Sequence, residues 1–598
     1  MTRFRPALLA ALLSTAVFGA PPAQAASTPH ELLTQLAQQM IDSMAQQDPM
    51  LATTLGIEGH DGELVNPSEA GRRQRIERLR RWSHEVDAIE HGGGTLTLVD
   101  ADDAKLLRAQ IDGQLEHLLV HETDRKDYAG PALALTDAVF TQFLHLPIPG
   151  RDGATPATRA QAWADITARL AGGPAYIEAG QKLVTHPGHL FGTVGAQQLQ
   201  GVPDFLTGPL SEAARTQLAD DPAALQRFEV ARDALLATLA RSKAYIDAHA
   251  ASWPENYAIG RKAYDEMLRR EKLLPFNGAD VELIGRNLLA HGWAEEAWLH
   301  DLSVQRGEAF GAASGGGMAP AGAALVGYYR ERIDELRRFV DAHQVITIPA
   351  WLGAMEVVET PKFLQPVSPG ASMNAPRLFA KSTTGYYFIT PPVSLEDAAK
   401  RLDMNEDFDH DRIMSTAAHE AMPGHFLQLS IAHRHPDLVR RLQDSDAFAE
   451  GWAFYGEEMF VRLGLFGDDL DARVFTARWE RVRGARAIVD VKLAAGEWSV
   501  AQAVDFFVAQ TGFTREASQA AIANFALRPG YAIAYSVGRL QLELLLSQYL
   551  QHKGAEASLR DFHDRLLSYG TTPFAIVGPE LLADLDKPAS AVRASANY

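Results

Sequence analysis

Apolar residues recur at intervals of three and four along most of the chain, which is the spacing of an amphipathic helix. The pattern is clear from His30 to Met44, from Leu325 to Val340 and from Leu540 to Tyr549. Aromatic and methionine side chains in these stripes are expected to face the core, and we assign them no function. The chain is therefore predicted to be mainly α-helical.

Two regions interrupt this pattern. Residues Gly311–Gly322 are rich in glycine and alanine, which is typical of a loop or a flexible connection. Beyond the next helix, Val345–Ile348 and Tyr386–Thr390 are rich in β-branched and aromatic residues and predict short strands. We expect one large helical body with a substrate cleft and a small β-sheet ahead of the histidine motif described below. Residues 26–310 and 324–598 are candidate lobes of this body, with the cleft between them.

The N-terminus has the three parts of a secretory signal peptide. Two arginines near the start are followed by Ala7–Ala20, an apolar run interrupted by small polar residues, and by the small-x-small cleavage site Ala23–Ala25. The run is short for a spanning helix, which needs ~20 apolar residues, so cleavage is favoured over a membrane anchor. We predict that residues 1–25 are removed and that residues 26–598 form a single domain in the periplasm or outside the cell.

The composition excludes several classes of function. The 598 residues contain no cysteine, which rules out disulfides, a thiol nucleophile and a lipid-modified cysteine in this sequence. The formal net charge of −19 opposes binding to nucleic acid and to anionic membranes. Hydrophobic residues make up 46% of the chain, enough for a large core. We therefore expect a globular protein with no nucleic-acid partner and no membrane partner after signal cleavage.

The motif with the clearest chemistry is the heptapeptide HEAMPGH, residues 419–425. Two histidines four residues apart would leave the same face of a helix, but His419 and His425 are six apart, about 120° out of alignment in a continuous helix. Pro423 removes a helix hydrogen bond and Gly424 can adopt backbone angles that other residues avoid. We predict that the helix breaks there and brings the imidazoles within about 4 Å, as two ligands of one tetrahedral ion must lie.

Glu450 is the best candidate for a third ligand. It begins a helical stretch in which the small residues Gly451 and Ala453 would let two helices approach closely. Asp444 and Asp446 are rivals for the same role. Two imidazoles and a carboxylate leave a fourth position of a zinc ion open for water, which is the arrangement of a catalytic site.

Two more glutamates have expected roles. Glu420 follows His419 and could reach a metal-bound water as a general base. Glu457 lies seven residues after Glu450, on the same helical face, and is a candidate outer partner that orients a ligand imidazole. The predicted cofactor is one Zn²⁺ ion, although imidazole and carboxylate also suit other divalent ions.

The chain resembles the bacterial family catalogued as domain of unknown function 885. The matching segments are residues 419–428 (HEAMPGHFLQ), 450–455 (EGWAFY), 528–532 (RPGYA), 535–538 (YSVG) and, near the N-terminus, 48–62. That family resembles distant glutamate-liganded zinc peptidases of the gluzincin type, which are largely helical and have a deep substrate channel. The resemblance implies the same three ligands and the same base that the motif indicates.

The resemblance also implies a downstream tyrosine that stabilises the oxyanion. We match this role to Tyr535, with Tyr531 as the second candidate. Arg528 and Arg539 are candidates to pair with a substrate carboxylate, or they form structural ion pairs in an acidic protein, the alternative we favour. Tyr387 lies in the second predicted strand, which could bind a peptide backbone by strand addition.

The sequence thus predicts a secreted or periplasmic zinc metallopeptidase. Short peptides are the expected substrates if helices enclose the site. Two alternatives remain open: a zinc amidohydrolase acting on cell-wall or modified-metabolite amides, and a non-catalytic binding protein of the same fold, which would hold a metal structurally, with a fourth protein ligand, or hold none. A serine hydrolase is disfavoured, because the chain lacks a G-x-S-x-G elbow.

Overall fold

The computed structural model describes residues 27–588, apart from residues 93, 148–154, 309–316, 366–370, 393, 395 and 397–408. The predicted signal peptide, residues 1–25, lies outside the described residues, and so does the first half of the predicted loop Gly311–Gly322. Among the described helices, none combines the length and the apolar character that a membrane crossing requires.

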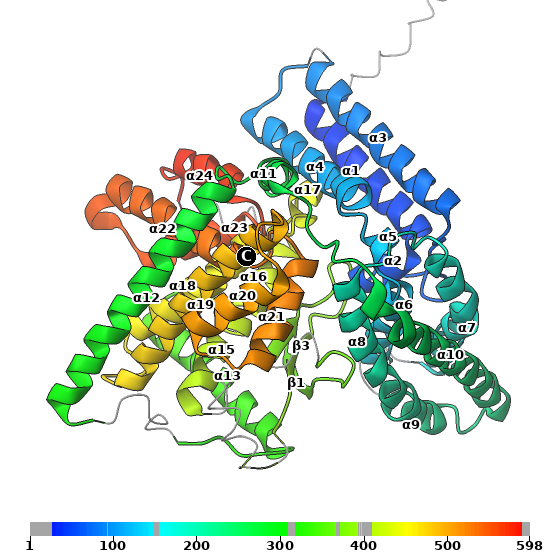
Figure 1. The fold of residues 1–598 in the computed structure, drawn as a ribbon. Helices are drawn as coiled ribbons and strands as arrows, with labels where there is room; N and C mark the ends of the chain where they lie inside the picture. The colour runs from blue at the N-terminus through cyan, green and yellow to red at the C-terminus, as the bar shows by residue number, and fades with distance from the viewer. Residues whose placement is uncertain are drawn as a thin grey trace, which may run out of the picture.

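The chain up to Arg306 is a succession of helices (Figure 1). These are α1 (Pro29–Gln47), α2 (Pro49–Leu55), α3 (Glu69–His91), α4 (Leu98–Glu116), η1 (His117–His121), α5 (Thr123–Lys126), α6 (Gly130–Leu144), α7 (Pro156–Gln181), α8 (His189–Thr207), α9 (Pro209–Gln217), α10 (Pro222–His249), η2 (Ala250–Ser252), α11 (Arg261–Arg270) and α12 (Gly278–Arg306). A capping box starts α1, because Thr28 and Glu31 each accept the other's backbone N–H. The stripe predicted from His30 to Met44 lies within α1, where Leu33, Leu36, Met40 and Ile41 are buried and Met44 is half-buried.

A second set of helices precedes and follows a small sheet in the sequence. These are α13 (Ala324–His343) before the sheet, and after it α15 (His410–Glu420), α16 (His425–Ala432), α17 (Leu438–Arg441), α18 (Asp446–Arg462), α19 (Leu470–Ala494), α20 (Val500–Thr511), α21 (Arg515–Leu527), α22 (Ala534–Lys553), η3 (Gly554–Glu556), α23 (Leu559–Ser568) and α24 (Phe574–Ala583). The helices predicted around Leu325–Val340 and Leu540–Tyr549 are α13 and α22. The mainly α-helical fold is therefore confirmed.

Within the described residues, three strands form a mixed sheet ahead of the histidine motif, as predicted. They are β1 (Met355–Glu359), β2 (Ala371–Asn374) and β3 (Gly385–Ile389). The strand order is β1-β3-β2, with β3 parallel to β1 and antiparallel to β2. The second predicted strand is therefore confirmed as β3.

The first predicted strand, Val345–Ile348, is wrong, because this segment is irregular. Its backbone is held by side chains of α23 and not by a strand ladder. Asp564 accepts the backbone N–H of Thr347 at 2.9 Å, and Nδ1 of His563 lies 2.9 Å from the carbonyl oxygen of Val345. These partners lie more than 200 residues away in the sequence, so no local pattern could reveal them.

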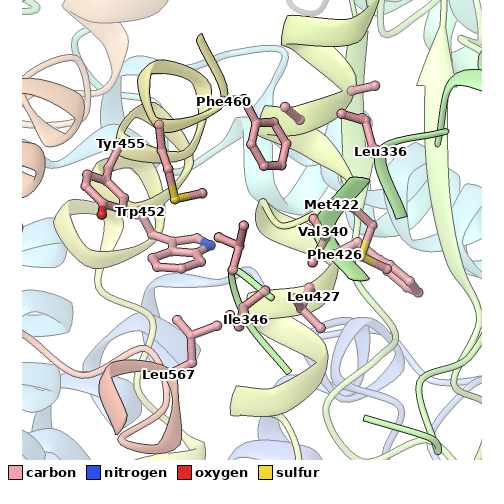
Figure 2. Close-up of a cluster of buried hydrophobic side chains, with 14 of the residues drawn as sticks. Leu336, Val340, Ile346, Met422, Phe426, Leu427, Trp452, Tyr455, Phe460 and Leu567 are labelled. Carbon is pink, nitrogen blue, oxygen red and sulfur yellow. The ribbon is translucent and has the colours of Figure 1, made fainter. Parts of the chain in front are cut away.

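The sheet lies between two hydrophobic cores. Alternate side chains of β3 serve different cores: Tyr387 and Ile389 join one that includes α13, α15, α16, α18 and α22, whereas Phe388 joins one made chiefly by α6 to α10. Figure 2 shows part of the first core, with Trp452 and Tyr455 on the left and Met422 and Phe426 on the right. In Figure 1 the labelled strands accordingly lie between α13 and α15 on one side and α8 on the other. The histidine motif belongs to the first core.

Candidate metal centre

The two histidines of the 419–425 motif lie on different helices. Helix α15 ends one residue after His419, and α16 begins at His425. The chain turns between them, with a cis peptide bond before Pro423. A Cβ atom on Gly424 would lie 1.7 Å from the carbonyl oxygen of His419, so only glycine fits at this position. The break predicted between the histidines is confirmed.

Helix α18 brings Glu450 to this turn. The indole N–H of Trp452 donates to the carbonyl oxygen of Pro423 at 2.8 Å and fixes the turn against the helix. On the other side α18 packs closely on α22, because a Cβ atom on Gly451 would lie 2.4 Å from the carbonyl carbon of Gly538. The close helix approach predicted at Gly451 is confirmed, and it places Glu450 between the histidine turn and the start of α22.

His419, His425 and Glu450 each offer one ligand atom, and these atoms all lie within 4.8 Å of one another. Oε2 of Glu450 lies 3.3 Å from Nε2 of His419 and 3.4 Å from Nε2 of His425. Two ligands bound to a tetrahedral ion at ~2.0–2.1 Å lie roughly 3.3–3.4 Å apart, so these spacings fit one divalent ion. Oε2 of Glu450 is buried and has no hydrogen-bond partner among the described residues, a deficit that a cation would satisfy.

Glu457 orients the first imidazole. Nδ1 of His419 lies 2.6 Å from Oε1 of Glu457, and Arg483 on α19 donates to both oxygens of that carboxylate, at 2.9 and 2.6 Å. A proton on Nδ1, shared with the carboxylate, leaves the lone pair of Nε2 directed toward Glu450. Glu457 thus lies where the predicted outer partner must be. Arg483 was not found from the sequence, because no spacing pattern connects α19 with the motif.

The electrostatics of the centre favour positive charge. Burial lowers the pKa of His419, but the carboxylates of Glu450 and Glu457 outweigh burial and raise that pKa to about 10. Burial acts to raise the pKa of Glu450, but His425 and His419 hold it well below its usual range. A divalent ion bound there would supply the positive charge that these carboxylates stabilise, and His419 would give up the proton on Nε2 to bind it.

Glu420, the predicted base, lies at the end of α15 beside the first ligand. Its side chain is half-buried and, within the described part of the chain, forms no hydrogen bond or ion pair. Burial raises the pKa of this carboxyl group, while His425 and His419 act to lower it. A carboxylate with free oxygen atoms and a raised pKa is suited to accept a proton from water.

Two tyrosines close another side of the centre. The hydroxyl of Tyr531 donates to Oε1 of Glu450 at 2.8 Å and lies 3.4 Å from the hydroxyl of Tyr535. The ring of Tyr535 stacks on that of His419, with ring centres 6.1 Å apart. The neighbouring Tyr535 raises the pKa of Tyr531, and burial raises the pKa of Tyr535, so both phenols stay protonated at neutral pH and can donate hydrogen bonds.

The two arginines predicted near the site have different surroundings. Nη1 of Arg539 lies 2.9 Å from both Glu458 and Glu480, so this guanidinium forms the structural ion pairs that the sequence favoured. Arg528 is exposed, and its guanidinium lies 3.9 Å from the ring centre of Tyr531. Arg528 therefore belongs to the surroundings of the centre, whereas Arg539 holds helices together.

The prediction that Tyr387 binds substrate is wrong. Its side chain is fully buried in the core, where its ring meets that of Tyr329 edge-on. Strand β3 is the central strand of the sheet and is paired on both sides, so it has no free edge to which a peptide could add. The pattern located the strand correctly, but it could not show that the strand is central.

Neither rival of Glu450 joins the ligand group. Asp446 pairs with Lys272 at 3.2 Å. Asp444 and Asp446 instead line a cavity of about 770 Å³ between α1 to α4 and the start of α18, together with Ala447, Gly530 and other residues. None of the three ligand residues lines this cavity, although Ala447 precedes Glu450 by one turn. The substrate cleft stays a prediction.

Comparison with known proteins finds one matching family profile and solved structures of similar fold. Residues 49–580 match the sequence profile described as "Bacterial protein of unknown function (DUF885)". Two similar solved structures are a candidate lipoprotein of unknown function from Shewanella oneidensis and a candidate lipoprotein from Colwellia psychrerythraea. The first is 20% identical with a TM-score of 0.70 and covers 92% of this chain and 99% of its own. The second is 18% identical with a TM-score of 0.75 and covers 94% and 100%.

Identities this low show a shared fold and nothing about activity. Among proteins with curated descriptions, none matches the chain. The function must therefore be argued from the site itself.

Proposed function

The chain belongs to this bacterial family of unknown function, DUF885, and we propose that it is a metal-dependent hydrolase of peptide bonds. The observation that carries the proposal is the spacing of 3.3 and 3.4 Å from one carboxylate oxygen of Glu450 to two imidazole nitrogens. Three protein ligands leave room for a substrate or water, which distinguishes a catalytic site from a closed structural one. A zinc ion bound there would polarise both a water molecule and the scissile carbonyl.

The protein groups around the ligands supply the remaining chemistry. Glu420 accepts the proton of the attacking water and passes it to the leaving amine, because its carboxylate has no competing partner among the described residues. The hydroxyl of Tyr535 donates to the oxyanion that develops on the carbonyl, and Tyr531 holds Glu450 in place at 2.8 Å. This assignment agrees with the resemblance to glutamate-liganded zinc peptidases.

The proposed location is the bacterial envelope or the extracellular medium. Its support is the signal-peptide pattern of residues 1–25 and the description of two proteins of the same fold as candidate lipoproteins. Short peptides are the proposed substrates, because the ligand residues are largely buried.

The test compares the wild type with Glu420→Gln by metal analysis and by digestion of a mixed peptide library. We expect about one zinc ion per chain in both proteins and a loss of cleavage of about 10²–10⁴-fold in the variant, the range for removal of a general base. Glu331→Gln changes an exposed glutamate of α13 and is the matched control, with no loss expected. A folded wild type that binds no metal, or a variant that still cleaves, would contradict the proposal.

A further inference from the structure

Arg486 is a cation beside the centre without an anionic partner. It lies on α19 three residues after Arg483, whose guanidinium is bound to both oxygens of Glu457. Within the described residues Arg486 forms no hydrogen bond and no ion pair, and its Nε atom is buried and unpartnered. A guanidinium that is partly removed from water and has no acceptor is unfavourable, so an unpaired arginine beside this centre indicates a site for an anionic ligand.

Aromatic rings hold this guanidinium in position. Its central carbon lies 5.3 Å from the ring centre of Tyr535, 5.1 Å from that of Trp479 and 5.8 Å from that of Phe525. Contacts with ring faces stabilise the charge but leave the N–H groups at the edge of the guanidinium free to donate. The side chain is also partly accessible, so a ligand can reach it.

A second unpaired arginine lies on the same side of the centre. Arg528 stacks on Tyr531 and makes no hydrogen bond or ion pair to any described residue. Each of the two tyrosines nearest Glu450 therefore has an arginine against its ring. The chain has 75 acidic and 56 basic residues, so a general shortage of carboxylates does not explain these two free cations.

We propose that Arg486 binds a carboxylate of the substrate and that the protein cleaves peptides close to a free C-terminus. This inference rests on the proposed function, in which the scissile carbonyl lies between the metal ligands and Tyr535. The guanidinium lies against the same tyrosine, so it can take a carboxylate a short distance along the chain from that carbonyl. Two parallel N–H groups then fix the position and direction of the peptide end.

The two sources of such a carboxylate are the C-terminus and an acidic side chain. The test therefore uses three peptides of otherwise equal sequence: a free acid, its C-terminal amide, and the amide with aspartate as the last residue. The wild type should cleave the free acid with a kcat/KM about 100-fold above that of either amide, because a buried charge pair is lost in both. Preference for the aspartyl amide would overturn the assignment to the C-terminus.

Variants of Arg486 test whether this residue causes the preference for a free C-terminal carboxylate. Arg486→Gln should lower kcat/KM for the free acid about 100-fold and change that for the amide less than about 2-fold. Arg486→Lys should recover part of the loss, because it restores the charge without the planar fork. Arg515→Gln removes an exposed arginine paired with Asp505 at 2.8 Å and is the matched control, with no change on any peptide. An equal fall on acid and amide in Arg486→Gln would overturn the inference.

A binding measurement separates this inference from the proposed function. Calorimetry with a dipeptide and with its amide needs no catalysis. The wild type should bind the free acid more tightly than the amide, and Arg486→Gln should remove the difference. If no peptide is cleaved but this preference is present, the proposed function fails and the carboxylate site stands. If peptides are cleaved without any preference for the acid, the carboxylate site fails and the hydrolase stands.

Discussion

The candidate metal centre and the cluster around Arg440 both hold carboxylates out of water beside nitrogen donors. In the Arg440 cluster the guanidinium donates to Asp103 at 2.6 Å and to the two oxygens of Glu580 at 3.0 and 2.7 Å. At the metal centre the nitrogen atoms beside Glu450 belong to two imidazoles, at 3.3 and 3.4 Å. A guanidinium keeps its protons and has no lone pair to offer, whereas an imidazole can lose a proton and bind a metal.

The pKa shifts of the two regions differ accordingly. Burial raises the pKa of Asp103 to about 6, although Arg440 acts to lower it. Burial also acts on Glu450, but the two imidazoles hold its pKa well below the usual range. The charged groups of the Arg440 cluster are therefore paired with one another in fixed ion pairs. The candidate metal centre keeps an ionised carboxylate beside groups that can exchange a proton for an ion.

Distance alone does not distinguish the two regions. His30, Asp103 and Asp437 also place ligand atoms within 4.8 Å of one another. Asp103 is already paired with Arg440, and Asp437 accepts the backbone N–H groups of Val439 and Arg440 at the start of α17. His30 is exposed. Both carboxylates of this second group are thus already engaged and its imidazole is exposed, so among the described residues we infer that the first region is the better candidate for a metal site.

The largest expected effect comes from breaking the fixed ion pairs. Arg440→Met should lower the free energy of unfolding by about 3–5 kcal/mol, because Asp103 and Glu580 stay buried without their cation. Urea unfolding at neutral pH measures this loss, and the zinc content of the folded protein should be unchanged. Arg462→Met, which removes an exposed arginine 3.4 Å from Glu458, should cost less than about 1 kcal/mol. Equal stability of the two variants would contradict the comparison.

A smaller effect, confined to metal binding, is expected from Glu450→Ala. One of three protein ligands is lost, and a single ligand's share of the ~10–16 kcal/mol of four-ligand zinc sites is about 2.5–4 kcal/mol. Competition with a chelator should therefore show an affinity about 10²–10³-fold weaker. Asp446→Ala removes the rival carboxylate of the same helix and should bind zinc like the wild type. The assignment of the ligand would be wrong if Asp446→Ala lost zinc instead.

The candidate centre was predictable from the sequence to the extent that its determinants are local. The six-residue spacing of His419 and His425 required a break, and Pro423 and Gly424 supplied it within the same heptapeptide. Helix periodicity placed Glu457 on the face of the third ligand, where the structure has it 2.6 Å from the first imidazole. Neighbouring residues determine the break between the histidines, and the helical period determines that Glu450 and Glu457 share a face.

The features that the sequence did not predict correctly depend on residues far apart in the chain. Val345–Ile348 is irregular because α23, far along the chain, supplies its hydrogen-bond partners. Tyr387 is buried because β3 is covered on both faces by helices from distant segments. Arg483 and Arg486 lie on α19, and no periodicity of that helix shows which one pairs with Glu457. Tertiary packing decides these features, and a single sequence does not show it.

Asp490 is a third buried carboxylate to compare with those beside Arg440 and beside the two imidazoles. Its hydrogen-bond donors are neutral. It accepts the backbone N–H groups of Gly530 at 2.8 Å and Ala532 at 3.0 Å, and the hydroxyl of Tyr264 at 2.8 Å. It thereby holds the turn that carries Tyr531 to the metal centre. Burial raises the pKa of Asp490 to about 6, although these hydrogen bonds act to lower it.

The smallest expected effect is the pH dependence that Asp490 adds to stability. Its folded-state pKa of about 6 exceeds the ordinary aspartate value of ~3.9, so the folded state binds the proton more tightly than the unfolded state. As the pH falls from 7 to 4, this group should therefore raise the free energy of unfolding, by on the order of 2 kcal/mol. Asp490→Asn cannot titrate and lacks this gain, so the stability of the wild type relative to the variant should increase over that interval. Urea titrations measure the difference in unfolding free energy between the wild type and the variant. If that difference stays constant between pH 7 and pH 4, the carboxylate of Asp490 remains ionised throughout. Neutral donors alone would then keep it ionised, just as the imidazoles keep Glu450 ionised.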